Sequence, residues 1–172
     1  LQQHYGPRNT VISVAGDVQH QEVVDLVGRL LSDWRGAAAP DFTPAPADGV
    51  GPHVALISKK VEQSHLALHL PGLARDHGDR FALGLLNVVL GEGMSSRLFL
   101  EIRERLGLAY AVDSYVSHLA DTGVTGVYAA VAPDRALEAL TAILAQLQRL
   151  RDELVDARTL HSAKEYIKGR LV

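Results

Sequence analysis

Hydrophobic and polar positions alternate with the period of a strand in some parts of the chain and with that of a helix in others. Residues 10–15 are rich in β-branched side chains and are followed by a helical pattern, which predicts one strand and one helix. Residues 54–57 and 64–70 predict two more strands, and the second alternates cleanly between apolar and polar positions. Residues 79–90 and 95–106 then carry the spacing of two helices.

A second pair of strands is expected over residues 109–117 and 123–132, because Asp121-Thr122-Gly123 favours a turn between them. Pro133-Asp134 opens a long helix, and Asp156 is expected to cap the last one. After the first strand and helix, strand pairs therefore alternate with helix pairs. This order predicts an α+β fold, in which an antiparallel-rich sheet has helices packed on one face.

One segment differs from the rest in composition. Residues 36–52 are dominated by Ala, Pro, Gly and Asp, and prolines at several positions disfavour both helix and strand. We interpret this segment as a linker. It separates a strand and helix unit in residues 1–35 from a second domain in residues 53–172.

Composition and charge exclude several classes of protein. The 172 residues are 47% hydrophobic and 22% charged, which are globular proportions. The chain has no Cys, so disulfides, thiolate zinc sites and thiol nucleophiles are excluded. The net charge is −3 and the basic residues are scattered, so we expect no nucleic acid partner. The longest apolar stretch, residues 81–90, is about half of a membrane span, so no membrane insertion is expected.

Both ends of the sequence indicate a piece of a longer chain. The first residues contain neither an initiator Met nor the pattern of a signal peptide. The last predicted helix stops at Val172 without a Gly or Asn cap. With no targeting signal in view, we expect a cytoplasmic location.

The sequence contains no complete metal-binding motif. His65 and His69 are four residues apart, but on a strand their rings lie about 13 Å apart, which is too far to share one ion. We interpret both as polar residues on a solvent or interface face. His-Glu-x-x-His and His-x-x-Glu-His do not occur in the sequence. The absence of both motifs disfavours a self-contained zinc hydrolase.

Two further groups of residues are candidates for binding. Gly91-Glu92-Gly93 loosely resembles a phosphate cradle, but it follows a helix and contains no P-loop Lys, so an interhelical turn fits better. Arg103 lies near the end of a predicted helix and Tyr110 at the start of the next strand. A guanidinium and a phenol at such a junction can bind a peptide carbonyl or an oxyanion. The alternative is a solvated arginine and a packed tyrosine.

Several stretches, in this order and spacing, resemble the pitrilysin/insulinase family of zinc metallopeptidases, which includes the mitochondrial processing peptidase. The resemblance covers nearly the whole chain. It is carried by residues 4–9, 15–18, 62–65, 70–73, 90–99, 102–110, Tyr115 and 121–123.

The resemblance implies where the chemistry of a longer protein would lie. In this family each half-chain consists of two similar α+β domains, and the first holds the zinc on a His-x-x-Glu-His helix with a later Glu. Residues 1–35 would end a first domain, and residues 53–172 would form most of a second, a metallopeptidase-like half-clamshell domain. Zinc is thus expected in the parent protein or in a partner subunit, and the resemblance implies neither a metal site nor a catalytic residue in this chain.

The resemblance also implies roles for four residues. Arg103 and Tyr110 match an Arg and a Tyr, seven residues apart, that reach the bound peptide. Gly91 and Gly93 match a glycine-containing loop implicated in substrate handling. The expected partners are a peptide substrate, and a preceding zinc-bearing domain or partner subunit in a homo- or heterodimer.

Three functions of the parent remain open: an active zinc endopeptidase that this domain closes, a non-catalytic partner that binds peptides, and a structural subunit like the core proteins of the respiratory bc1 complex. The chain alone is not expected to be an enzyme.

If the two domains are alike, the closing strand of the second lies beyond Val172. We therefore predict that strand 10–15 adds to the free edge of the second-domain sheet, within the chain or across a dimer.

Overall fold

The computed structural model describes residues 5–36, 42–46 and 51–171. Contacts divide the chain after Pro44 into two units, which are described separately here. The division falls inside the predicted linker 36–52, of which residues 37–41 and 47–50 lie outside the described residues. None of the helices within the described part of the chain is long and apolar enough to cross a membrane.

The first unit contains a short 3-10 turn, η1 (Pro7–Asn9), and one amphipathic helix, α1 (His20–Leu30). The strand predicted over residues 10–15 is wrong, because this stretch has no β-partner among the described residues. Its side chains Ile12 and Val14 instead line an apolar hollow with residues of α1. A β-rich sequence becomes a strand only where a second backbone completes its hydrogen bonds. The addition of residues 10–15 to the sheet of the second unit, within the chain or across a dimer, stays a prediction.

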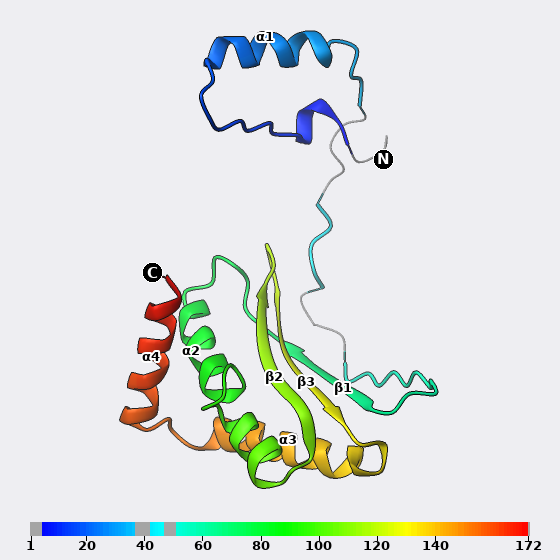
Figure 1. Ribbon diagram of the computed structural model, residues 1–172, viewed down its shortest axis with the longest axis vertical. Helices are drawn as coiled ribbons and strands as arrows, with labels where there is room; N and C mark the ends of the chain where they lie inside the picture. Colours follow the sequence, from blue (N-terminus) through cyan, green and yellow to red (C-terminus); the bar gives the residue numbers. More distant parts are fainter. Residues whose placement is uncertain (1–4, 37–41, 47–50, 172) are drawn as a thin grey trace. The chain divides into compact units, whose positions relative to one another are not determined.

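The second unit is built on a three-stranded antiparallel sheet (Figure 1). The strands are β1 (Ser64–Pro71), β2 (Ala109–His118) and β3 (Gly123–Val131), in the spatial order β1-β3-β2. All three match predicted strands. The strand predicted over 54–57 is wrong, since Val54 and Leu56 are 90% and 93% exposed and no described strand pairs with them.

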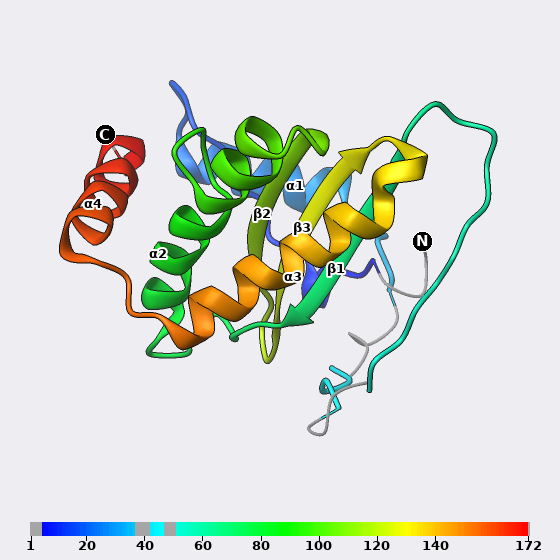
Figure 2. The same cartoon turned by 90° about the horizontal axis from the view of Figure 1, so that it is seen from below.

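Five helical segments complete the described part of this unit. They are α2 (Arg80–Leu90), the π-helical η2 (Phe99–Arg105), the 3-10 turn η3 (Pro133–Arg135), α3 (Ala136–Asp152) and α4 (Ala157–Leu171). Helices α2 and α4 lie side by side (Figure 1), and α3 crosses the sheet (Figure 2). Asp156 caps α4, as predicted, by accepting bonds from the amides of Thr159 at 2.9 Å and Arg158 at 3.0 Å.

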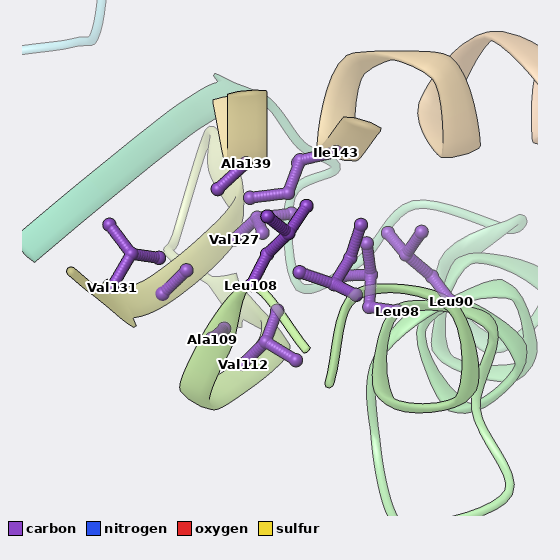
Figure 3. Close-up of a cluster of buried hydrophobic side chains, with 11 residues drawn as sticks. Leu90, Leu98, Leu108, Ala109, Val112, Val127, Val131, Ala139 and Ile143 are labelled. Carbon is purple, nitrogen blue, oxygen red and sulfur yellow. The ribbon is translucent and has the colours of Figure 1, made fainter. Parts of the chain in front are cut away.

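The core lies between the sheet and these helices (Figure 3). Val127, Ala129 and Val131 alternate along β3 and so face the same side of the sheet. They pack against residues that include Leu98 and Ile143, both fully buried. Burial of each of these large side chains stabilises the fold by about 1.5–3 kcal/mol. The predicted α+β fold with helices on one face of an antiparallel sheet is confirmed.

Candidate functional site

One end of the sheet brings together residues that are far apart in the sequence. Because β1 and β2 both run antiparallel to β3, Ser64 and Ala109 flank Val131 from opposite sides. Eight residues around this point line a shallow hollow of about 460 Å³. They are Glu62, Gln63, Gly107, Leu108, Ala109, Tyr110, Val131 and Ala132.

Tyr110 is held at this hollow with its ring in solvent. It lies at an irregularity of β2, where the register with β3 shifts between Ala109 and Ala111. Its neighbours Leu108 and Ala109 are buried in the core, whereas Tyr110 itself is 74% exposed. Buried neighbours therefore fix the backbone while the phenol stays accessible. No hydrogen bond of its hydroxyl occurs within the described residues.

A tight connection joins η2 to β2 just before Tyr110. Gly107 has φ +59°, in the left-handed region that glycine adopts without a Cβ penalty. Leu106 donates its amide to the Glu101 carbonyl at 3.0 Å, the i to i+5 spacing of a π-helix. Segments of this kind are frequent at functional sites in proteins.

Arg103 lies on η2 and has only weak partners. Its guanidinium lies 4.9 Å from the centre of the Phe99 ring and 3.9 Å from the Glu104 carboxylate. The Arg103 side chain is 45% exposed, so these contacts leave its donors available. Arg103 is not among the residues of the hollow, and no hydrogen bond, ion pair or ring contact joins it to Tyr110 in the described structure. The two predicted residues thus lie on consecutive elements, on either side of Gly107.

Gly91 and Gly93 both have structural reasons to be glycine. A Cβ on Gly91 would lie 2.6 Å from the amide nitrogen of Ser114, so the turn after α2 approaches β2 too closely for a side chain. Gly93 has φ +92°, and its carbonyl accepts a bond from Ser96 Oγ at 2.7 Å. These findings explain the loop without a ligand, and its role in substrate handling stays a prediction.

The sheet face opposite the helices carries polar and aromatic pairs. His65 Nδ1 lies 2.7 Å from the Tyr128 hydroxyl, and His69 Nε2 lies 2.6 Å from the Tyr115 hydroxyl. Both histidines are exposed, which agrees with the interpretation of a solvent or interface face. Burial raises the pKa of Asp113 on β2 above its usual value. Sequence reasoning missed the tyrosine partners, because the register between strands is not visible in the sequence.

The described residues do not fit a zinc site. Within residues 5–36, 42–46 and 51–171, no group of three or more His, Cys, Asp or Glu side chains could hold a metal ion. Three or four such ligands are the usual requirement for zinc.

Comparison with known proteins identifies the family. Residues 1–167 match the family model described as the peptidase M16 inactive domain. The chain belongs to this family. An uncharacterized zinc protease of Streptomyces coelicolor is 44% identical over 143 residues, which are 80% of this chain and 31% of that protein. An uncharacterized zinc protease of Rickettsia bellii is 39% identical over 169 residues, 98% of this chain and 40% of that protein.

The M16 inactive domain is also the fold of a solved relative. A crystal structure titled as the peptidase M16 inactive domain from Pseudomonas fluorescens covers 90% of this chain and 37% of its own, with a TM-score of 0.74 and 23% identity. At that identity the likeness concerns the fold alone. This M16 domain spans well under half the length of these relatives.

Proposed function

We propose that this M16 domain is the substrate-binding and closing domain of a longer zinc endopeptidase that hydrolyses peptides. Support comes from the family and from relatives named zinc proteases, of which the chain spans 31% to 41%. Zinc and the catalytic groups would lie in the remainder of the longer protein. A homo- or heterodimer and a cytoplasmic location belong to the same proposal.

The exposure of Tyr110 is the observation that carries this proposal. A tyrosine normally contributes its ring to packing, whereas Tyr110 is 74% exposed beside the buried Leu108. Its hydroxyl is available as donor and acceptor, and a peptide backbone offers complementary groups at every residue. Arg103, on the preceding element η2, adds a half-exposed guanidinium that can bind a carbonyl.

Variants of these two side chains in the full-length protein test the proposal. We expect Tyr110→Phe and Arg103→Ala each to weaken peptide affinity, or to raise KM where the peptide is cleaved, by about tenfold. Tyr5→Phe and Arg158→Ala alter exposed residues elsewhere and serve as matched controls. Affinity is measured by fluorescence anisotropy, with mass spectrometry to detect cleavage. Equal affinities for all four variants would contradict a role of Arg103 and Tyr110 in binding.

Zinc content of the full-length protein separates the alternatives for the parent. We expect about one zinc per chain by elemental analysis, as for an active peptidase. A zinc-free protein that still loses peptide binding in Arg103→Ala would be a non-catalytic partner subunit. A zinc-free protein that binds no peptide would be a structural subunit. Either zinc-free result would overturn the proposed endopeptidase.

A further inference from the structure

We propose that the ring of Phe99 positions the guanidinium of Arg103 for binding a peptide carbonyl. This inference rests on the proposed function and adds a residue that acts through Arg103 rather than on the peptide itself. It concerns η2, the π-helical segment that carries both side chains.

Phe99 and Arg103 lie four residues apart on η2, and their side chains are in contact. The central carbon of the guanidinium lies over the Phe99 ring, 4.9 Å from its centre. This distance is within the range of about 6 Å in which the negative face of an aromatic ring attracts a cation. The contact therefore favours one conformation of Arg103 over the many that a long surface side chain otherwise samples.

The Phe99 ring lies on a part of η2 that the core holds in place. Phe99 is half-buried and directly follows Leu98, which is fully buried. Ile102, the residue before Arg103, is also fully buried. Because these two neighbours fix the backbone, the ring is a stationary surface for the guanidinium, which itself remains accessible to solvent.

The acidic residues of η2 leave the donors of Arg103 available. Glu101 pairs with Arg105, whose Nε donates to it at 2.7 Å. The Glu104 carboxylate lies 3.9 Å from Arg103 Nε, too far for a hydrogen bond. Exposed ion pairs of this kind contribute little. An aromatic ring, unlike a carboxylate, has no lone pairs that take up the N–H groups, so Arg103 can be held by Phe99 and still donate to a carbonyl.

Fluorination of the Phe99 ring tests this inference in the full-length protein. Phenylalanine analogues with one, two or three fluorine atoms on the ring are incorporated in place of Phe99. Fluorine withdraws electron density from the ring face and weakens its attraction for a cation, while the ring keeps nearly the same shape and packing. We expect peptide affinity, measured by fluorescence anisotropy, to fall stepwise with each fluorine and to be about threefold weaker with three.

Two controls separate the attraction of the ring from other effects of fluorine. Arg80 lies 4.2 Å from the centre of the Phe81 ring, which makes a second arginine and phenylalanine pair in the same unit. The same analogues in place of Phe81 should leave peptide affinity unchanged. The analogues in place of Phe99 should have no effect in the Arg103→Ala variant, because the ring then has no cation to position.

The combined results keep this inference distinct from the proposed function. If Arg103→Ala weakens binding while every analogue at Phe99 binds like the wild type, the site binds peptides but Phe99 does not position Arg103. If fluorination weakens binding equally in Arg103→Ala, the ring acts by another route and the inference is overturned. If no peptide binds, or if neither Arg103→Ala nor Tyr110→Phe weakens binding, the proposed function fails and the inference fails with it.

Discussion

The turn at Gly91 is in direct contact with Ser114 of β2. The Ser114 amide donates to the Gly91 carbonyl at 3.3 Å, and its hydroxyl donates to the Asn87 side-chain oxygen at 2.8 Å. Both Asn87 and Ser114 are buried, so this contact joins the end of α2 to the edge of the sheet. A glycine in a loop that resembles a substrate-handling segment thus has a packing role of its own.

Gly91→Ala should destabilise the domain because the new methyl group would overlap the Ser114 backbone, where nothing can rotate away. We expect a loss of about 1–3 kcal/mol in the free energy of unfolding, measured with urea. Gly84→Ala, within α2 and with no atom near its Cβ, is the control and should stabilise the domain by about 0.5–1 kcal/mol. Equal stabilities would show that the turn can move away from β2.

Leu98→Ala should be among the most destabilising single changes, since this side chain is fully buried between η2 and the sheet. We expect a loss of about 2–5 kcal/mol, because the change removes buried apolar surface and leaves a cavity. The nearby Leu100 is 51% exposed, so Leu100→Ala should cost less than about 1 kcal/mol. Urea unfolding of both variants measures the difference. Similar losses would contradict the packing described here.

The cap of α4 should make stability depend on pH. The bonds that Asp156 accepts, above all from Thr159, hold the pKa of its carboxyl below the usual value. Its stabilisation is therefore complete above the unfolded pKa and is lost as pH falls through the folded pKa. We expect Asp156→Ala to lower the Tm by about 3 °C at pH 7 and by less at pH 2. A difference that grows on acidification would contradict the cap.

Asp113 should make the stability of the domain depend on pH in the direction opposite to that of Asp156. Because burial raises the pKa of its carboxyl, the folded state favours the neutral form, and stability falls as pH rises through the folded pKa. Asp113→Asn should therefore raise the Tm at pH 7 and change it less at pH 3. Asp33→Asn, an exposed residue of the first unit, should leave the Tm unchanged at both values. Thermal unfolding followed by circular dichroism gives all four comparisons.

Sequence reasoning found the sheet of the second unit but overestimated its strands. The hairpin at Asp121 and the alternation of residues 64–70 were interpreted correctly, since both signals are local. Residues 10–15 and 54–57 carry the same β-rich composition, yet neither is a strand in the described structure. Composition indicates which segments can form β-strands, but a strand forms only where a partner backbone lies at hydrogen-bond distance.

The candidate site also contains residues that the sequence identified and a residue whose position only the structure shows. Arg103 and Tyr110 were identified from their resemblance to a family motif, and the structure adds the exposure of Tyr110. Glu62 was part of that resemblance but had no assigned role. Its position at the hollow depends on β3 lying between β1 and β2, an arrangement that no spacing in the sequence specifies.

The sequence by itself determined the helices α2, α3 and α4, the hairpin of β2 and β3, the cap at Asp156 and the membership in the M16 family. These features depend on residues within a few positions of each other, or on motifs in fixed order. Only the tertiary structure decided that Glu62 and Tyr110 line one hollow and that His69 meets Tyr115. Burial of the apolar face against α3 sets the strand order and register, and register decides which distant side chains become neighbours.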